Sequence, residues 1–142
     1  MTVTGQTGQS IASAEPGARS ARRILLVEDD RFLRRACEAS LRQRGFDVRT
    51  ASDGEEGLRL ALSEPFDLIL LDILMPKLTG LDVLRALRAA ESTRETSVLV
   101  LSNSSSPSDM GEVAALGALG YWVKANLSLQ ELGDRVEQLL KI

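Results

Sequence analysis

The chain has 142 residues, of which 44% are hydrophobic and 26% charged, and its formal net charge is −3 at pH 7. This composition is typical of one globular domain with a hydrophobic core, and the weak negative charge argues against direct binding to nucleic acid or to an anionic membrane. With no histidine and a single cysteine, Cys37, the chain cannot build a Ser-His-Asp triad, a His-ligated zinc site, a phosphohistidine or an internal disulfide.

Residues 1–22 are rich in glycine, serine, threonine and glutamine, and they predict a disordered N-terminal tail before one domain at 23–142. The tail lacks the apolar segment of a signal peptide, and no apolar run approaches the ~20 residues of a membrane-spanning helix. We therefore expect a cytoplasmic protein, with Cys37 as a buried free thiol in a reducing compartment.

The first half of the domain alternates short apolar segments with helical patterns. Residues Ile24 to Glu28 predict a buried strand, and Phe46 to Ala51, where apolar and polar side chains alternate, predict an edge strand. Between these strands, a helical pattern follows Asp30, its expected N-cap, and stops at Gly45.

The middle of the domain continues this alternation. Asp53 is the expected N-cap of a second helix over Glu55 to Ser63. The continuous apolar run from Phe66 to Leu71 fits a strand that is buried on both faces of a parallel sheet. A third helix is expected from Leu81 to about Ala90, and Val98 to Leu101 predict another buried strand.

The last part contains a helical pattern from Pro107 to Leu119 that two glycines weaken, and a final strand at Tyr121 to Val123. Ser128 and Glu131 predict a capping box at the start of a terminal helix. Together these elements predict an α/β fold, a five-stranded parallel sheet of the flavodoxin-like order 2-1-3-4-5 with five helices on both faces.

Polar side chains collect where the predicted strands end. Glu28 and Asp29 end the first strand, Asp72 the third, Ser102 the fourth and Lys124 the fifth. Each has an ordinary explanation alone, as a cap, a turn residue or a solvated charge. Because ligands bind outside the carboxyl ends of such strands, their joint occurrence predicts a functional site at that edge.

The chemistry of this set is coherent. Glu28, Asp29 and Asp72 would repel one another unless a cation lies between them, and oxygen ligands without histidine or cysteine favour Mg²⁺, or Mn²⁺ in its place. A carboxylate beside Mg²⁺ can attack phosphorus and form an acyl phosphate. The metal and the Lys124 ammonium would neutralise charge on the transferred oxygens, and Ser102 could donate a hydrogen bond to the phosphoryl group. The pattern therefore predicts that a carboxylate of this cluster can accept a phosphoryl group.

From Arg23 to the C-terminus, the sequence resembles the receiver domain of two-component response regulators. The motifs that carry this resemblance are Val27-Glu28-Asp29-Asp30, the apolar run into Asp72 followed by Met75-Pro76 and Gly80, Leu101-Ser102, and Tyr121-Trp122-Val123-Lys124. The resemblance covers essentially everything after the predicted tail.

The resemblance implies that Asp72 is the phospho-acceptor, assisted by Lys124. It also implies a Mg²⁺ ion held by Asp29, Asp72 and the backbone carbonyl of Leu74. Glu28 would not contact the ion directly but would support the residues that do. Such a domain is not an ordinary enzyme, because it catalyses only its own phosphorylation and slow dephosphorylation.

The resemblance further implies a switch and a set of partners. Ser102 and Tyr121 would act as a coupled switch, and the donor would be the phosphohistidine of a histidine kinase or a phosphotransfer protein. An unidentified downstream protein would bind the face made by the fourth helix, fifth strand and fifth helix, and phosphorylation could also drive homodimer formation.

Three positions depart from the family pattern. Asn103 follows the switch hydroxyl, and Leu74 offers no polar side chain to guide a hydrolytic water. Ala125 stands where the family usually has a proline after Lys124, so we expect a trans bond there and an altered loop. None of these changes removes a reacting group, so they bear on rates and loop shape.

Other functions are weighed against this one. A Mg²⁺-dependent phosphohydrolase usually needs a second acid two residues after its aspartate nucleophile, and Leu74 occupies that position. A dinucleotide-binding domain lacks support, since no glycine-rich loop follows the first strand. A docking module that keeps the fold but works without phosphorylation stays an alternative, although the acidic pocket, Ser102 and Lys124 argue against it.

Overall fold

The structure is a computed structural model that describes residues 21–103 and 106–140. Most of the predicted tail, residues 1–20, lies outside the described residues. Five strands form one parallel sheet in the order β2-β1-β3-β4-β5, as the sequence predicted. The strands are β1 (Arg23–Val27), β2 (Asp47–Ala51), β3 (Leu68–Asp72), β4 (Val98–Ser102) and β5 (Gly120–Val123).

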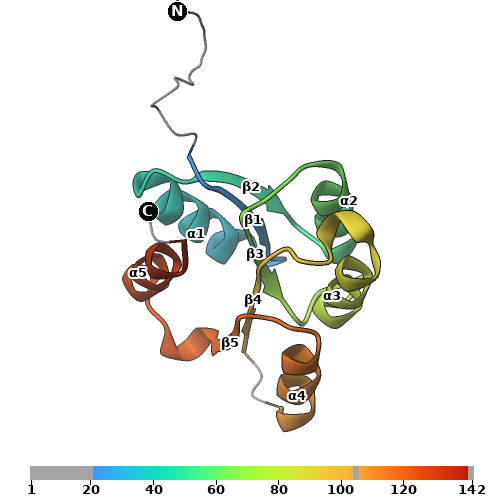
Figure 1. Cartoon of the computed structure of the whole chain (residues 1–142). Coiled ribbons are helices and arrows are strands. Elements are labelled where there is room, and N and C mark those ends of the chain that lie inside the picture. Colours follow the sequence, from blue (N-terminus) through green and yellow to red (C-terminus); the bar gives the residue numbers. More distant parts are fainter. Residues whose placement is uncertain (1–20, 104–105, 141–142) are drawn as a thin grey trace, which may run out of the picture.

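Helices cover both faces of this sheet, with α1 and α5 on one face and α2, α3 and α4 on the other (Figure 1). The α-helices are α1 (Arg31–Gln43), α2 (Gly54–Ser63), α3 (Gly80–Ala89), α4 (Pro107–Ala115) and α5 (Leu129–Leu140). Two 3₁₀ turns, η2 (Glu91–Thr93) and η3 (Lys124–Asn126), lie in the connections. No helix within the described ranges is long and apolar enough to cross a membrane.

The strands alternate their side chains between two hydrophobic layers. Along β1, Leu25 and Val27 pack in the layer under α2, α3 and α4, whereas Ile24 and Leu26 pack in the layer under α1 and α5. Every residue of β3 is buried, as its continuous apolar run predicted, and Cys37 of α1 is a buried free thiol. The sheet therefore has a hydrophobic centre, and β1 and the adjacent β3 end at the same edge of it.

The predicted helix starts are confirmed by their hydrogen bonds. The side chain of Asp30 accepts a hydrogen bond from the Leu33 amide at 3.1 Å, and that of Asp53 accepts one from the Glu56 amide at 2.8 Å. At α5, the amide of Ser128 donates to Glu131, whose own amide donates to the Ser128 hydroxyl, both at 3.0 Å. These local caps place each helix directly after a strand or loop.

Two features differ from the predicted course of the chain. Helix α4 ends at Ala115 rather than Leu119, because Gly117 adopts a left-handed φ of 76° and the Leu119 amide bonds to the carbonyl of Val98 instead. The loop after β5, for which the sequence predicted no regular element, contains the 3₁₀ turn η3. The described residues contain no cis peptide bond, so the expected trans bond between Lys124 and Ala125 is confirmed.

Candidate functional site

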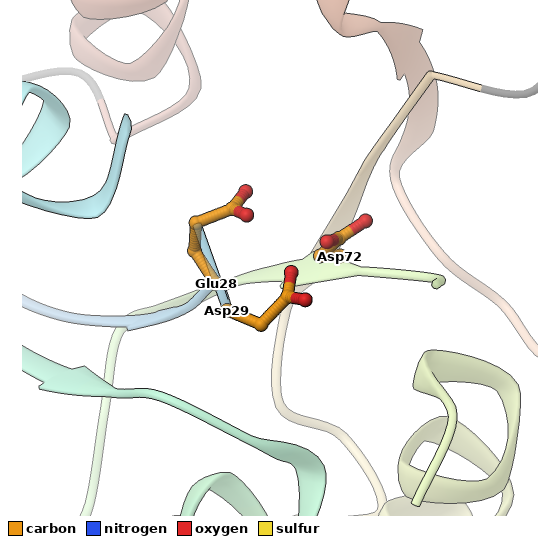
Figure 2. Close-up of side chains that lie close together, drawn as sticks. All are labelled: Glu28, Asp29 and Asp72. Atoms are coloured by element: carbon orange, nitrogen blue, oxygen red, sulfur yellow. The ribbon is translucent and has the colours of Figure 1, made fainter. Parts of the chain in front are cut away.

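Three carboxylates converge at the carboxyl edge of the sheet (Figure 2). Glu28 and Asp29 follow β1, and Asp72 is the last residue of the adjacent strand β3, so all three lie at one end of the sheet. One oxygen from each carboxylate lies within 4.8 Å of the others. Glu28 is 2% exposed and Asp72 is 4% exposed, whereas Asp29 is exposed. The structure thus brings together the three acids that the sequence singled out.

Lys124 reaches this cluster from the far side of β4. Its ammonium nitrogen lies 2.6 Å from Glu28 Oε1 and 3.2 Å from Asp72 Oδ2, and its side chain is only 12% exposed. Burial lowers the pKa of Lys124, but the hydrogen bond to Glu28 and the charges of Asp72 and Glu28 outweigh burial and raise it. Lys124 is therefore a buried, charged partner of two of the three acids.

Asp72 is electrostatically strained without a cation. Burial raises the pKa of its carboxyl to about 6, and the neighbouring charge of Glu28 adds to this effect, whereas Lys124 opposes it. A single ammonium cannot compensate three carboxylates, so a hard divalent cation would stabilise the cluster. The donor set consists of oxygens, which fits Mg²⁺ or Mn²⁺.

The two oxygens of Glu28 are already engaged by the protein. Oε1 accepts from Lys124, and Oε2 accepts from the amide of Asp30 at 3.0 Å. Asp29, by contrast, is exposed at the mouth of the cluster, and Oδ1 of Asp72 accepts from the amide of Leu74 at 3.3 Å. This arrangement fits Glu28 as a support and Asp29 and Asp72 as the acids that face a cation.

Ser102 and Tyr121 lie on the two strands beyond Asp72. Ser102 is the last residue of β4, is fully buried, and follows Leu101, which pairs in register with Asp72. Tyr121 is half-buried on β5, pairs with Val100, and packs against the hydrophobic layer under α2, α3 and α4. The hydroxyl of Ser102 and the ring of Tyr121 thus belong to neighbouring strands near one edge.

The residues that depart from the family pattern are at the surface. The side chain of Leu74 is 59% exposed, and Asn103 and Ala125 are also exposed. These positions can therefore affect access to the acidic cluster without disturbing its buried members.

One residue at this edge, Arg34 of α1, was not predicted from the sequence. Its Nη1 donates to the backbone carbonyls of Glu28 at 2.9 Å and of Asp29 at 3.4 Å. The only sequence signal was an arginine one turn into the helix that follows the acidic motif. Such a position is usually solvent-exposed, so nothing local marked this side chain.

Comparison with known proteins gives the same picture. Residues 24–137 match the family model of the response regulator receiver domain. The chain is 42% identical over 119 residues to the transcriptional activator protein PfeR of Pseudomonas aeruginosa, covering 84% of this chain and 38% of PfeR. It is 40% identical over 119 residues to the transcriptional regulatory protein CpxR of Escherichia coli, covering 84% of this chain and 49% of CpxR. The chain thus spans about half or less of the length of these relatives.

Solved structures agree with the sequence relatives. The chemotaxis response regulator CheY4 of Vibrio cholerae superposes with a TM-score of 0.76 at 31% identity, covering 83% of this chain and 98% of CheY4. The receiver domain of the Francisella response regulator 1452 gives a TM-score of 0.76 at 31% identity, covering 84% of this chain and 97% of that domain. The chain therefore belongs to the response regulator receiver domain family.

Proposed function

We propose that this chain accepts a phosphoryl group on Asp72 and thereby acts as a switch in two-component signal transduction. The observation that carries the proposal is the buried carboxylate of Asp72, held 3.2 Å from the Lys124 ammonium and within 4.8 Å of two further acids. A carboxylate needs such neighbours to act as a nucleophile toward phosphorus, because negative charge builds up on the transferred oxygens.

In the proposed reaction, an Asp72 carboxylate oxygen attacks the phosphorus of a phosphohistidine on the donor. A phosphorus–oxygen bond forms and the phosphorus–nitrogen bond breaks; the donor ring takes the electron pair of the broken bond and leaves as neutral imidazole, because its other ring nitrogen is already protonated. Asp29, Asp72 and the backbone carbonyl of Leu74 would hold a Mg²⁺ ion, which supplies charge neutralisation for the transferred oxygens. Lys124, oriented by Glu28, adds a second positive charge, and the Ser102 hydroxyl donates a hydrogen bond to the product.

The donor proposed here is a histidine kinase or a phosphotransfer protein, acting in the cytoplasm. This part of the proposal is supported by the family and by the exposed mouth of the acidic cluster at Asp29, through which a donor residue could approach. Residues 23–142 would form the receiver domain, preceded by 1–22 as a tail; the family model supports this by matching residues 24–137.

Output is proposed to run through the face made by α4, β5 and α5, with Ser102 and Tyr121 as the coupled switch. When Ser102 bonds the phosphoryl group, the Tyr121 ring would move into the space beside β4. Two features support this route, since α4 buries only Val113 and every residue of β5 is half-buried. A downstream protein, or a second copy of this chain, would bind the altered face.

The proposal is tested by intact mass measurement after incubation with acetyl phosphate and Mg²⁺. The wild type should gain the mass of one phosphoryl group, and Asp72→Asn should gain none. Asp30→Asn is the matched control, because it removes an acid from the same motif while asparagine still serves as an N-cap. Equal labelling of wild type and Asp72→Asn would disprove the acceptor assignment, and an unlabelled wild type would favour the phosphorylation-independent docking module.

The output route is tested separately by amide hydrogen exchange with and without beryllofluoride, a phosphoryl mimic. Exchange should change in residues 103–125, which include α4 and β5. Changes confined to α1 and α2 would contradict this route while leaving the acceptor assignment intact.

A further inference from the structure

Arg34 bonds three successive carbonyl groups of the acidic turn. Its side chain donates to the carbonyls of Glu28 and Asp29, at 2.9 and 3.4 Å, and its own amide donates to the carbonyl of Asp30 at 2.8 Å. These carbonyls lie beyond the end of β1 at Val27. The bond from the Arg34 amide is an ordinary backbone bond of α1, so the side chain of this half-buried residue itself holds two carbonyls, those of the two acids in the turn.

The two acids of this turn depend on Arg34 to different degrees. The carboxylate of Glu28 is also held by Lys124 and by the amide of Asp30. Asp29 is exposed and sits beside two like charges, which would push its carboxylate toward solvent. Its place near Asp72 is therefore more sensitive to the path of its backbone.

We propose that Arg34 is a positioning residue that keeps the Asp29 carboxylate within reach of Asp72 and so strengthens binding of the divalent cation. This inference rests on the proposed function, because it concerns the same cation site. The described hydrogen bonds of the Arg34 side chain go to carbonyl oxygens, so this side chain does not compete with a cation for the carboxylate oxygens of Asp29. Residues that hydrogen-bond to the ligands of a metal, without contacting the metal, typically act in this way by fixing the orientation of the ligands.

The sign of the effect separates positioning from simple electrostatics. A guanidinium near a cation site repels the cation, so charge alone predicts that removing Arg34 strengthens Mg²⁺ binding. Positioning predicts the opposite, because a freed turn must be reordered each time the ion binds.

The experiment compares Mg²⁺ binding by wild type, Arg34→Met, Arg34→Lys and Arg35→Met, using titration calorimetry. Arg35 is the matched control, since it is exposed, adjacent in α1 and carries the same charge. We expect Arg34→Met to bind Mg²⁺ about tenfold more weakly than wild type, Arg34→Lys to fall between them, and Arg35→Met to bind as wild type or slightly more tightly.

A second readout distinguishes positioning from a general loss of stability. The rise in Tm caused by Mg²⁺ should be smaller in Arg34→Met than in Arg35→Met, whatever their values of Tm in chelator. If Arg34→Met does not fold, Arg34→Lys carries the same comparison. Mg²⁺ binding by the Arg34 variants that equals or exceeds that of Arg35→Met overturns the inference, whereas wild type that neither binds Mg²⁺ nor is labelled overturns the proposed function and the inference with it.

Discussion

Two strand–helix units of this domain, β3 with α3 and β5 with α4, differ in how many of their residues are buried. All five residues of β3 are buried, whereas all four of β5 are half-buried. Helix α3 buries Gly80, Val83, Leu84 and Leu87, whereas α4 buries only Val113. The proposed acceptor, Asp72, is the last residue of β3 and so belongs to the tightly packed unit. The loosely packed unit, β5 with α4, forms part of the proposed output surface. A rigid acceptor beside a movable surface is what a switch requires.

The space around one glycine in each helix shows the same difference in packing. A Cβ atom at Gly80 of α3 would overlap the carbonyl oxygen of Asp72, whereas a Cβ atom at Gly111 of α4 would meet nothing within 4 Å. The backbone of α3 thus closely approaches the proposed acceptor residue, whereas Gly111 of α4 faces open space.

The largest expected effect follows from this contrast. Gly80→Ala should lower the free energy of unfolding by about 3 kcal/mol or more, because backbone atoms must shift to make room. Gly111→Ala should raise it by about 0.5–1 kcal/mol, since alanine restricts the unfolded chain and clashes with nothing. Urea denaturation measures both changes, and similar effects of the two substitutions would contradict the claimed difference between the helices.

Helix α4 is held to α3 largely by two arginines of α3. Arg85 forms an ion pair with Glu112 in the middle of α4. Arg88 donates to the carbonyl of Leu116 at 2.7 Å and to that of Gly117 at 3.4 Å, where α4 ends. The same guanidinium also donates to three carbonyls around η2. With little apolar burial, these polar contacts are a large part of what keeps α4 in place.

A smaller effect is therefore expected from Arg88→Met. Loss of these hydrogen bonds should destabilise α4 locally by about 1–3 kcal/mol, so that its amides exchange roughly 5-fold faster or more. The amides of β3 should change less. Arg94→Met is the control, because Arg94 is exposed and its side chain lies beside the same region. Uniform acceleration across β3 and α4 would mean that α4 does not open as a separate unit.

Lys124, which directly follows β5, forms an ion pair with Asp72 at the end of β3, and the pH dependence of stability probes that contact. The folded state raises the pKa of Asp72 from 3.8 to about 6, so it binds more protons than the unfolded state between these values. The contribution of this group to stability therefore rises as the pH falls through this range, and above it the ionised carboxylate is a cost.

The smallest expected effect is the difference in Tm between Asp72→Asn and wild type in chelator. Asp72→Asn should melt about 3 °C higher near pH 7.5, and this gap should shrink as the pH falls through about 6 toward 4. Acidification also weakens contacts of Asp53 and Glu131, whose backbone hydrogen bonds lower the pKa of each, but both proteins share that loss. A gap that grows on acidification would contradict the charge crowding around Asp72.

Local patterns were enough to predict most of the fold. The apolar run into Asp72 predicted a central buried strand, and the caps at Asp30 and Asp53 predicted where two helices begin. These signals are local, because strand burial and helix capping depend on residues only a few positions apart. The end of α4 was wrong by four residues, since the helical pattern continues past Gly117 and does not reveal that the Leu119 amide pairs with Val98.

What the sequence by itself determined is the set of polar groups proposed to react and the edge of the sheet on which they meet. Only the tertiary structure decided which groups touch. Lys124 lies 96 positions after Glu28 and yet bonds it directly, and the side chain of Arg34 turns back to the carbonyls of the acidic turn. Such contacts depend on how strands and helices pack in three dimensions. Hydrophobic periodicity and capping residues are local signals, so they do not show which side chains far apart in the sequence will touch.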